Sequence, residues 1–168
     1  MKLHARAIGA TLGCALIVAG ADQLVKGLVT QTLMLNVPVP VISGVCNLTY
    51  RQNTGAAFSM FHTQPMAVLI AVNLIVLAIF MALVRPYLRQ RLGIAAAALI
   101  LGGGIGNVID RFRLRYVVDY LDIRITPSYT WPTFNLADAC VVVGVVLLMF
   151  VILHAERHAA TPRKSETV

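Results

Sequence analysis

The chain has 168 residues, of which 58% are hydrophobic and 12% charged, and its mean hydropathy is +0.79. This length fits one domain, and the composition is far too apolar for an ordinary soluble domain. The formal net charge of +7 does not indicate nucleic acid binding, because the basic residues lie in short stretches between apolar runs and not among aromatic residues on a polar face.

Four apolar segments are long enough to cross a bilayer, whose hydrocarbon core of about 30 Å needs roughly 20 helical residues. They are residues 7–29, 66–84, 92–109 and 136–154, and residues 155–168 follow as a polar tail. We therefore predict one integral membrane domain over residues 1–168. The first apolar run continues well past Cys14, so we expect an uncleaved transmembrane helix and not a signal peptide.

The basic residues predict the orientation of these spans. They precede the first span, fill the turn between the second and third, and follow the fourth: Lys2, Arg6, Arg85, Arg89, Arg91, Arg157, Arg163 and Lys164. With four spans, all of these positions fall on one side, which the positive-inside rule identifies as the cytoplasm. Both termini are then cytoplasmic, and residues 30–65 and 110–135 face outward. Arg113, Arg115 and Arg124 weaken this asymmetry without reversing it.

The first span carries two charged residues of opposite sign near its outer end. Asp22 and Lys26 are four residues apart, which places them on one helix face. Pairing lowers the cost of both charges at membrane depth. We interpret them as a structural ion pair, with a direct chemical role as the alternative.

The first outward connection has an extended character. Valine and proline alternate over residues 37–41 and Ile42 follows, and residues 47–53 have a period of two that puts Asn47, Thr49, Arg51 and Asn53 on one face. Small residues follow in the segment Asn53-Thr54-Gly55-Ala56-Ala57-Phe58-Ser59, where another backbone can approach closely. This region is either a simple turn into the second helix or a platform for an extended peptide.

The third span contains Gly102-Gly103-Gly104-Ile105-Gly106. Gly102 and Gly106 have the small-xxx-small spacing that favours tight helix contact. No Lys-Ser/Thr follows, so the glycines do not indicate a phosphate loop. Asn107, Asp110 and Arg111 come next near the outer end of this span. They predict either a polar network that supports a site or an interfacial cap and ion pair.

Two aspartates flank the outer mouth of the four spans. Asp119 lies beyond the third span, and Asp138 lies on the first turn of the fourth, three residues after Asn135. Taken singly, Asp119 could be a surface acid of a loop and Asp138 an acid at a helix N-terminus. Their common depth and side favour a pair instead, because ionisable groups beside a membrane are kept mainly for function.

A close pair of carboxylates cannot ionise both members cheaply, so one proton is shared. The ionised partner can take a proton from water while the protonated partner polarises a carbonyl, which is peptide hydrolysis without a metal or covalent intermediate. No Cys-x-x-Cys motif or His/Cys cluster indicates a metal, and we expect no cofactor. Cys14 and Cys140 fit packing positions within apolar runs, and Cys46 has no evident partner.

Five motifs in this order resemble the lipoprotein signal peptidase family, also called signal peptidase II, of bacteria. They are Asp22-x-x-x-Lys26, Asn53-Thr54-Gly55-Ala56-Ala57-Phe58-Ser59, Gly106-Asn107-x-x-Asp110-Arg111, Val117-Val118-Asp119-Tyr120 and Phe134-Asn135-x-Ala137-Asp138. The third and fifth are specific individually, and the order of all five on four spans strengthens the resemblance.

The resemblance implies an aspartyl endopeptidase of the bacterial inner membrane that removes the signal peptide from diacylglyceryl-modified prolipoproteins. The cut would lie N-terminal to the modified cysteine, and globomycin-type cyclic peptides would inhibit by occupying the dyad. Asp119 and Asp138 match the catalytic dyad. The positions that match residues lining or supporting the site are Asn53, Gly55, Asn107, Asp110, Arg111 and Asn135. The implied fold is four transmembrane helices with a small extracytoplasmic β-sheet and a short extracytoplasmic helical element, and we expect a monomer in contact with membrane lipids.

Two departures from the family pattern lie near Asp119. Tyr120 stands where phenylalanine is common, and Arg115-Tyr116 stands where the family often has a glycine.

Two other function classes remain as alternatives to the peptidase. A small proton-coupled transporter would use Asp22 or Asp138 as a membrane carboxylate, and a non-enzymatic assembly or lipid-binding factor would use the Gly-rich helix and the extended loop.

Overall fold

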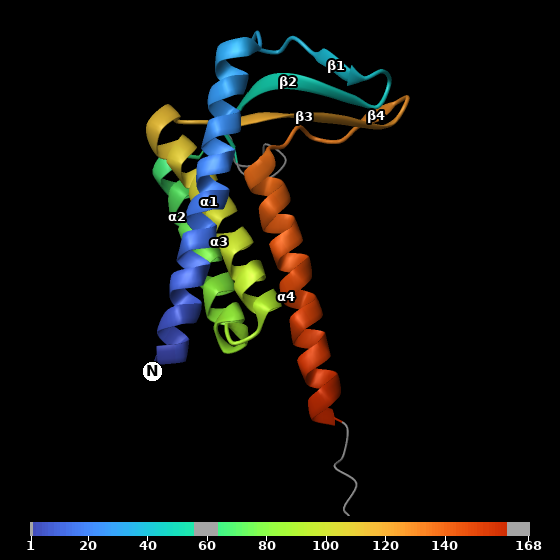
Figure 1. The fold of residues 1–168 in the computed structure, drawn as a ribbon. Coiled ribbons are helices and arrows are strands. Elements are labelled where there is room, and N and C mark those ends of the chain that lie inside the picture. Colours follow the sequence, from blue (N-terminus) through green and yellow to red (C-terminus); the bar gives the residue numbers. More distant parts are fainter. Residues whose placement is uncertain (1, 56–63, 161–168) are drawn as a thin grey trace, which may run out of the picture.

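The computed structural model describes residues 2–55 and 64–160, and in these residues four long helices stand side by side below a small sheet (Figure 1). The helices are α1 (Lys2–Thr32), α2 (Met66–Val84), α3 (Arg91–Leu114) and α4 (Leu136–Ala160). Each is long and apolar enough to cross a membrane. The predicted four-helix membrane architecture with a small sheet is therefore confirmed.

Three of the helices are longer than the predicted spans. α1 extends beyond residues 7–29 at both ends, α3 continues past residue 109 to Leu114, and α4 runs to Ala160. Residues 155–160 of the predicted polar tail are therefore the helical end of α4, and residues 161–168 lie outside the described residues. Hydropathy marks the apolar part of a helix, whereas the backbone hydrogen bonds continue through polar residues to the cap.

Glycines let α3 approach its neighbours closely. A Cβ at Gly102 would lie 2.6 Å from the carbonyl oxygen of Ala15 in α1, and one at Gly103 would collide with the carbonyl oxygen of Ala137 in α4. A Cβ at Gly104 would lie 3.0 Å from a side-chain carbon of Leu77 in α2. α3 therefore packs against all three other helices through consecutive residues, where the sequence predicted a tight contact without naming its partners.

The sheet contains β1 (Val39–Ile42), β2 (Cys46–Asn53), β3 (Val117–Thr126) and β4 (Tyr129–Thr130). All neighbouring strands are antiparallel, and their order in space is the order in the sequence. The sheet lies at one end of the helices and extends away from the bundle axis (Figure 1). A cluster of Val29, Tyr50, Val118 and Tyr120 packs the sheet against α1.

The predicted alternation of faces over residues 47–53 is wrong in its second half. Thr49 and Tyr50 are both buried, and Arg51 and Gln52 are both exposed. The pairing of β2 with β3 shifts between Leu48 and Arg51, where β2 has one residue more than β3. Such a bulge places two successive residues against one partner, so the side chains beyond it change face.

The turn between α2 and α3 contains the 3₁₀ segment Arg85–Tyr87 and lies at the end of the bundle opposite the sheet. The N-terminal end of α1 and the C-terminal end of α4 lie at that same end (Figure 1). The family resemblance also implies a short helical element, which is expected at the end of the bundle that carries the sheet. Residues 56–59, which complete the second motif, lie outside the described residues.

Candidate active site

One asparagine contacts both of the aspartates singled out in the sequence. The side-chain nitrogen Nδ2 of Asn135 donates to Oδ1 of Asp119 at 2.8 Å, and its backbone N–H donates to Oδ2 of Asp138 at 3.2 Å. Asp119 is the third residue of β3, and Asp138 is on the first turn of α4. Asn135 therefore brings acids from two separate elements together.

The position of Asp138 follows from local helix-capping chemistry. Oδ1 of Asn135 accepts the backbone N–H of Asp138 at 2.9 Å, while Asp138 accepts the backbone N–H of Asn135. This reciprocal arrangement is a capping box, which satisfies donors that the first turn of a helix leaves unpaired. Asp138 is thus a helix-terminal acid, the alternative considered for it, and at the same time a neighbour of Asp119 through Asn135.

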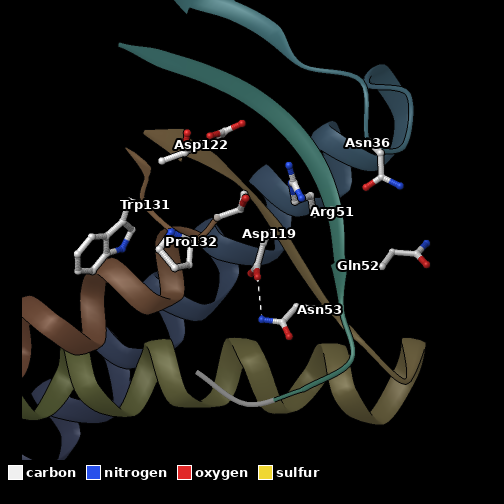
Figure 2. A pocket seen from close by; sticks show the side chains of 10 residues that line it. Asn36, Arg51, Gln52, Asn53, Asp119, Asp122, Trp131 and Pro132 are labelled. Atoms are coloured by element: carbon white, nitrogen blue, oxygen red, sulfur yellow. Dashed lines mark hydrogen bonds between the residues drawn. The ribbon is translucent and has the colours of Figure 1, made fainter. Parts of the chain in front are cut away.

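The other oxygens of the two carboxylates accept hydrogen bonds from two further asparagines. Nδ2 of Asn53 donates to Oδ2 of Asp119 at 3.0 Å, a contact drawn in Figure 2. Nδ2 of Asn107 donates to Oδ1 of Asp138 at 2.8 Å. All four carboxylate oxygens are therefore held by N–H groups that do not themselves titrate, which fixes the carboxylates without supplying a competing proton acceptor.

Asp119 is buried, with 3% of its surface exposed, so it is not the surface acid of a loop considered as an alternative. Burial raises the pKa of Asp119 to about 7, and the negative charge of Asp138 adds to the increase. The hydrogen bonds from Asn53 and Asn135 act in the opposite direction on this pKa. Asp119 therefore exchanges its proton near neutral pH, where a group that acts as general acid or base is most effective.

Lys26 joins three acceptors beneath the two aspartates. Its Nζ lies 2.8 Å from Oδ2 of Asp22, 2.8 Å from Oδ2 of Asp110 and 2.9 Å from Oδ1 of Asn107. The ion pair of Asp22 and Lys26 is present, but it is fully buried and extends to α3. An ammonium group has three N–H donors, and here each has a partner, which offsets the cost of burying the charge.

The two acids of this cluster also hold the elements that carry Asp119 and Asp138. Oδ1 of Asp22 accepts the backbone N–H of Ala137 at 3.0 Å, at the start of α4. Oδ2 of Asp110 accepts the backbone N–H of Val118 at 3.0 Å, one residue before Asp119 in β3. The buried charges in α1 and α3 therefore set the position of both candidate catalytic elements.

Two further residues contribute to this network: Gln23, which sequence reasoning missed, and Tyr120, which it noted only as a departure from the family pattern. Nε2 of Gln23 donates to Oδ1 of Asp110 at 2.8 Å. Gln23 directly follows Asp22 in the sequence, and this position is the signal that could have identified it. The hydroxyl of Tyr120 accepts the backbone N–H of Leu136 at 3.1 Å. Burial raises the pKa of Tyr120 to about 12, so this hydroxyl stays neutral. The departure from phenylalanine thus adds a contact between β3 and α4.

Arg111 and Gly55 lie beside the aspartates and contact each other. Nη2 of Arg111 donates to the carbonyl oxygen of Gly55 at 3.2 Å, and the backbone N–H of Gly55 donates to Oδ1 of Asn53 at 3.0 Å. Nε and Nη1 of Arg111 are buried and have no hydrogen-bond partner among the described residues. The positive charge of Arg111 interacts with both Asp119 and Asp138. A positive charge therefore lies beside the two carboxylates.

An apolar cavity of about 690 Å³ leads to the two aspartates. Its walls come mainly from α2, α3 and α4, with Leu69, Val72 and Val142 among the lining residues, and Asp119, Asp138 and Arg111 also border it. A volume of this size fits the range of roughly 300–1,000 Å³ that is typical of ligand sites. Among residues 2–55 and 64–160, no three His, Cys, Asp or Glu side chains are grouped to hold a metal ion.

The family model described as "Signal peptidase (SPase) II" matches residues 14–154. The chain belongs to the signal peptidase II family. It is therefore a membrane-spanning peptidase, as the resemblance of the five motifs predicted. The lipoprotein signal peptidase of Halothermothrix orenii is 41% identical over 144 residues, covering 84% of this chain and 94% of the relative. That of Moorella thermoacetica is 42% identical over 144 residues, covering 83% of this chain and 89% of the relative.

Solved structures support the same family fold. A bacterial membrane enzyme solved by the in meso method at 2.3 Å superposes with a TM-score of 0.76 and 27% identity, covering 96% of both chains. A second, solved by that method at 1.9 Å, has a TM-score of 0.69 and 29% identity over 87% of this chain and 94% of its own. The long helices and the sheet of this chain thus have counterparts in solved membrane enzymes.

Proposed function

We propose that this signal peptidase II homologue cuts diacylglyceryl-modified prolipoproteins on the N-terminal side of the modified cysteine, with Asp119 and Asp138 as its catalytic pair. The printed names of the relatives support lipoproteins as substrates. The observation that carries the catalytic assignment is the double contact of Asn135, which donates to both carboxylates. The raised pKa of Asp119 supports a shared proton near neutral pH.

In the proposed reaction the pair holds one proton. The ionised carboxylate takes a proton from a water molecule, whose oxygen attacks the scissile carbonyl carbon, while the protonated carboxylate donates to the carbonyl oxygen. The tetrahedral intermediate then collapses: the C–N bond breaks, the leaving amine takes a proton from the pair, and a hydroxyl proton of the intermediate returns to the pair. The products are the signal peptide with a new carboxyl group and the mature chain with a new amine on its cysteine.

The remaining matched residues have supporting roles in this proposal. Asn53, Asn107 and Asn135 fix the carboxylates through their N–H donors. Arg111 supplies positive charge beside the pair and holds the carbonyl of Gly55. Such fixed donors and charges stabilise a transition state without having to reorganise. The apolar cavity among the helices would hold the hydrophobic part of the signal peptide and the lipid chains.

The proposed setting is the bacterial inner membrane, with a single domain that acts as a monomer. Among the described residues, the basic residues at the start of α1, in the turn between α2 and α3 and at the end of α4 lie at the end of the bundle opposite the sheet, which supports cytoplasmic termini and an active site near the outer face. Globomycin-type cyclic peptides are expected to inhibit by occupying the pair. The transporter alternative is disfavoured by membership in a peptidase family.

The proposal is tested with detergent-purified protein and a diacylglyceryl-modified prolipoprotein whose size is followed on a gel. Asp119→Asn and Asp138→Asn should each lower kcat by about 10³-fold or more, since neither variant retains the pair. Glu156→Gln is the matched control, because it neutralises an exposed acid of α4 far from the site and should cut normally. Turnover within a few-fold of wild type by either aspartate variant contradicts the proposal. Substrate flux driven by a pH gradient in sealed vesicles would favour the transporter.

A further inference from the structure

A second cavity, polar and of about 360 Å³, borders Asp119 from the side of the sheet. Figure 2 shows it between β2, β3 and the segment before α4, with Asn36, Arg51 and Asp122 around it. It shares Asn53, Asp119 and residues 131–133 with the apolar cavity. Asp119 therefore lies at the boundary between two cavities of opposite character.

The two cavities match the two parts of a signal-bearing lipoprotein. The apolar cavity is formed mainly by membrane-spanning helices and suits a hydrophobic segment and acyl chains. The polar cavity is lined by the sheet, beyond the ends of those helices, and suits hydrated polypeptide. A chain cut at the boundary would leave its signal segment in the apolar cavity, so the residues after the cut would enter the polar one.

We propose that the polar cavity binds the polypeptide segment immediately C-terminal to the modified cysteine, and that Arg51 makes the site prefer acidic residues in that segment. This inference rests on the proposed function, since it requires a peptide bond cut beside Asp119. The cavity volume lies at the lower end of the roughly 300–1,000 Å³ found for ligand sites. An extended chain advances about 3.3 Å per residue, so only the first few residues after the cut would be held.

Arg51 provides the accessible charge of this cavity. Its side chain is exposed, and no ion pair joins it to an acid of the described residues. Asp122, on the opposite strand, is 93% buried and accepts a hydrogen bond from Oγ1 of Thr49 at 3.2 Å. Asp119 is held by its two asparagines. An incoming side chain therefore meets the guanidinium of Arg51 before either carboxylate.

The test compares three lipid-modified prolipoprotein substrates that differ only at the second and third residues after the cysteine, which are both Asp, both Lys or both Ser. The readout is the ratio of kcat/KM for the Asp and Lys substrates at low salt, so that a general loss of activity cancels. The expected ratio for the wild type is about five, the effect of one partly exposed ion pair. Arg51→Glu should invert this ratio, and Arg51→Gln should bring it close to one.

Arg124→Glu is the matched control, because this exposed arginine of β3 does not line the cavity. It makes the same change in net charge and should keep the wild-type preference. Equal kcat/KM for all three substrates overturns the inference while leaving the peptidase intact. An inversion as large in Arg124→Glu as in Arg51→Glu also overturns it, since the effect would then come from the overall charge. Failure of the wild type to cut any of the three substrates, with a control enzyme cutting them, overturns the proposed function itself.

Discussion

At the scale of single residues, the site combines buried acids with neutral amides. Asn53, Asn107 and Asn135 supply the N–H groups that hold Asp119 and Asp138. Amides keep their donors at every pH at which the protein is folded, so the carboxylates can gain or lose a proton without losing their positions. Burial disfavours the ionised form of Asp119, so holding this carboxylate in the site lowers the stability of the folded protein when Asp119 is charged.

Asp119→Asn is expected to stabilise the protein in a pH-dependent way. The pKa of Asp119 is about 7 in the folded protein and 3.8 as a free group, so the unfolded chain loses its proton first as pH rises. The contribution of Asp119 to wild-type stability therefore falls between about pH 4 and pH 7, and its loss is complete above pH 7. Thermal unfolding in detergent should show the stability of the variant rising relative to wild type by up to about 4 kcal/mol from pH 4.5 to pH 8. An equal gain at both pH values contradicts this.

Arg115→Gly is expected to stabilise the junction between α3 and β3. Arg115 ends α3 with a φ of 68°, a left-handed conformation that costs an L residue roughly 1–2 kcal/mol and glycine very little. Glycine also gains freedom in the unfolded chain, so a net gain of about 0.5–1 kcal/mol is expected. The melting temperature in detergent should rise by a few degrees, whereas Arg113→Gly, inside the helix, should lower it. A lower melting temperature for Arg115→Gly would contradict this, because it would mean that the Arg115 side chain stabilises the protein by more than its left-handed backbone conformation destabilises it.

At the scale of elements, α3 is the helix on which the other three pack. Its glycines face α1, α4 and α2 in turn, and its polar end carries Asn107, Asp110 and Arg111 into the site. The same helix therefore sets both the spacing of the bundle and the position of the polar network.

Gly103→Ala is expected to separate α3 from α4 and to disturb Asp138. The added methyl group would meet the carbonyl oxygen of Ala137, a backbone atom next to Asp138, and cannot be avoided by a side-chain rotation. Overpacking of this kind costs about 1–3 kcal/mol. Melting temperature and kcat should both fall. Gly13→Ala is the matched control, because its Cβ meets no atom within 4 Å, and it should be neutral or slightly stabilising. Unchanged activity in Gly103→Ala would contradict the close contact.

The sequence predicted the elements whose signals are local. The apolar run of α2 gave its bounds as Met66–Val84, and α4 begins where Asn135 and Asp138 predicted a first turn. β3 was not predicted as a strand, although Leu121, Ile123 and Ile125 alternate with polar residues there. The contacts of Lys26 with α3 and of Asp22 with α4 join residues far apart in the chain, and spacing in one segment carries no information about them.

At the scale of the whole molecule, the two cavities and the sheet define a path across the site. The apolar cavity is bordered by three helices, and Val142 of α4 lines it. A bulky residue there should fill space that the hydrophobic part of a substrate would occupy.

Val142→Trp is expected to raise KM by about tenfold or more, because the larger side chain would occupy part of the apolar cavity. The melting temperature should change little, because the side chain of Val142 is exposed and a larger one displaces no packed neighbour. Val146→Trp is the matched control, one turn further along α4, exposed and outside the lining of the cavity. Steady-state cleavage of the lipid-modified prolipoprotein measures both. An equal rise in KM for both variants would mean that the cavity is not the binding site.

The start of α4 is held by residues that precede it in the chain. The first three amides of the helix donate to Tyr120 of β3, Asp22 of α1 and Asn135. During synthesis the first three helices and the sheet are made before Asp138, and the carboxylate pair does not exist until the last helix inserts and its amides reach those acceptors. With the proposed catalytic pair, a nascent or truncated chain that lacks α4 would have no proteolytic site, and cleavage would begin only once the last helix has docked.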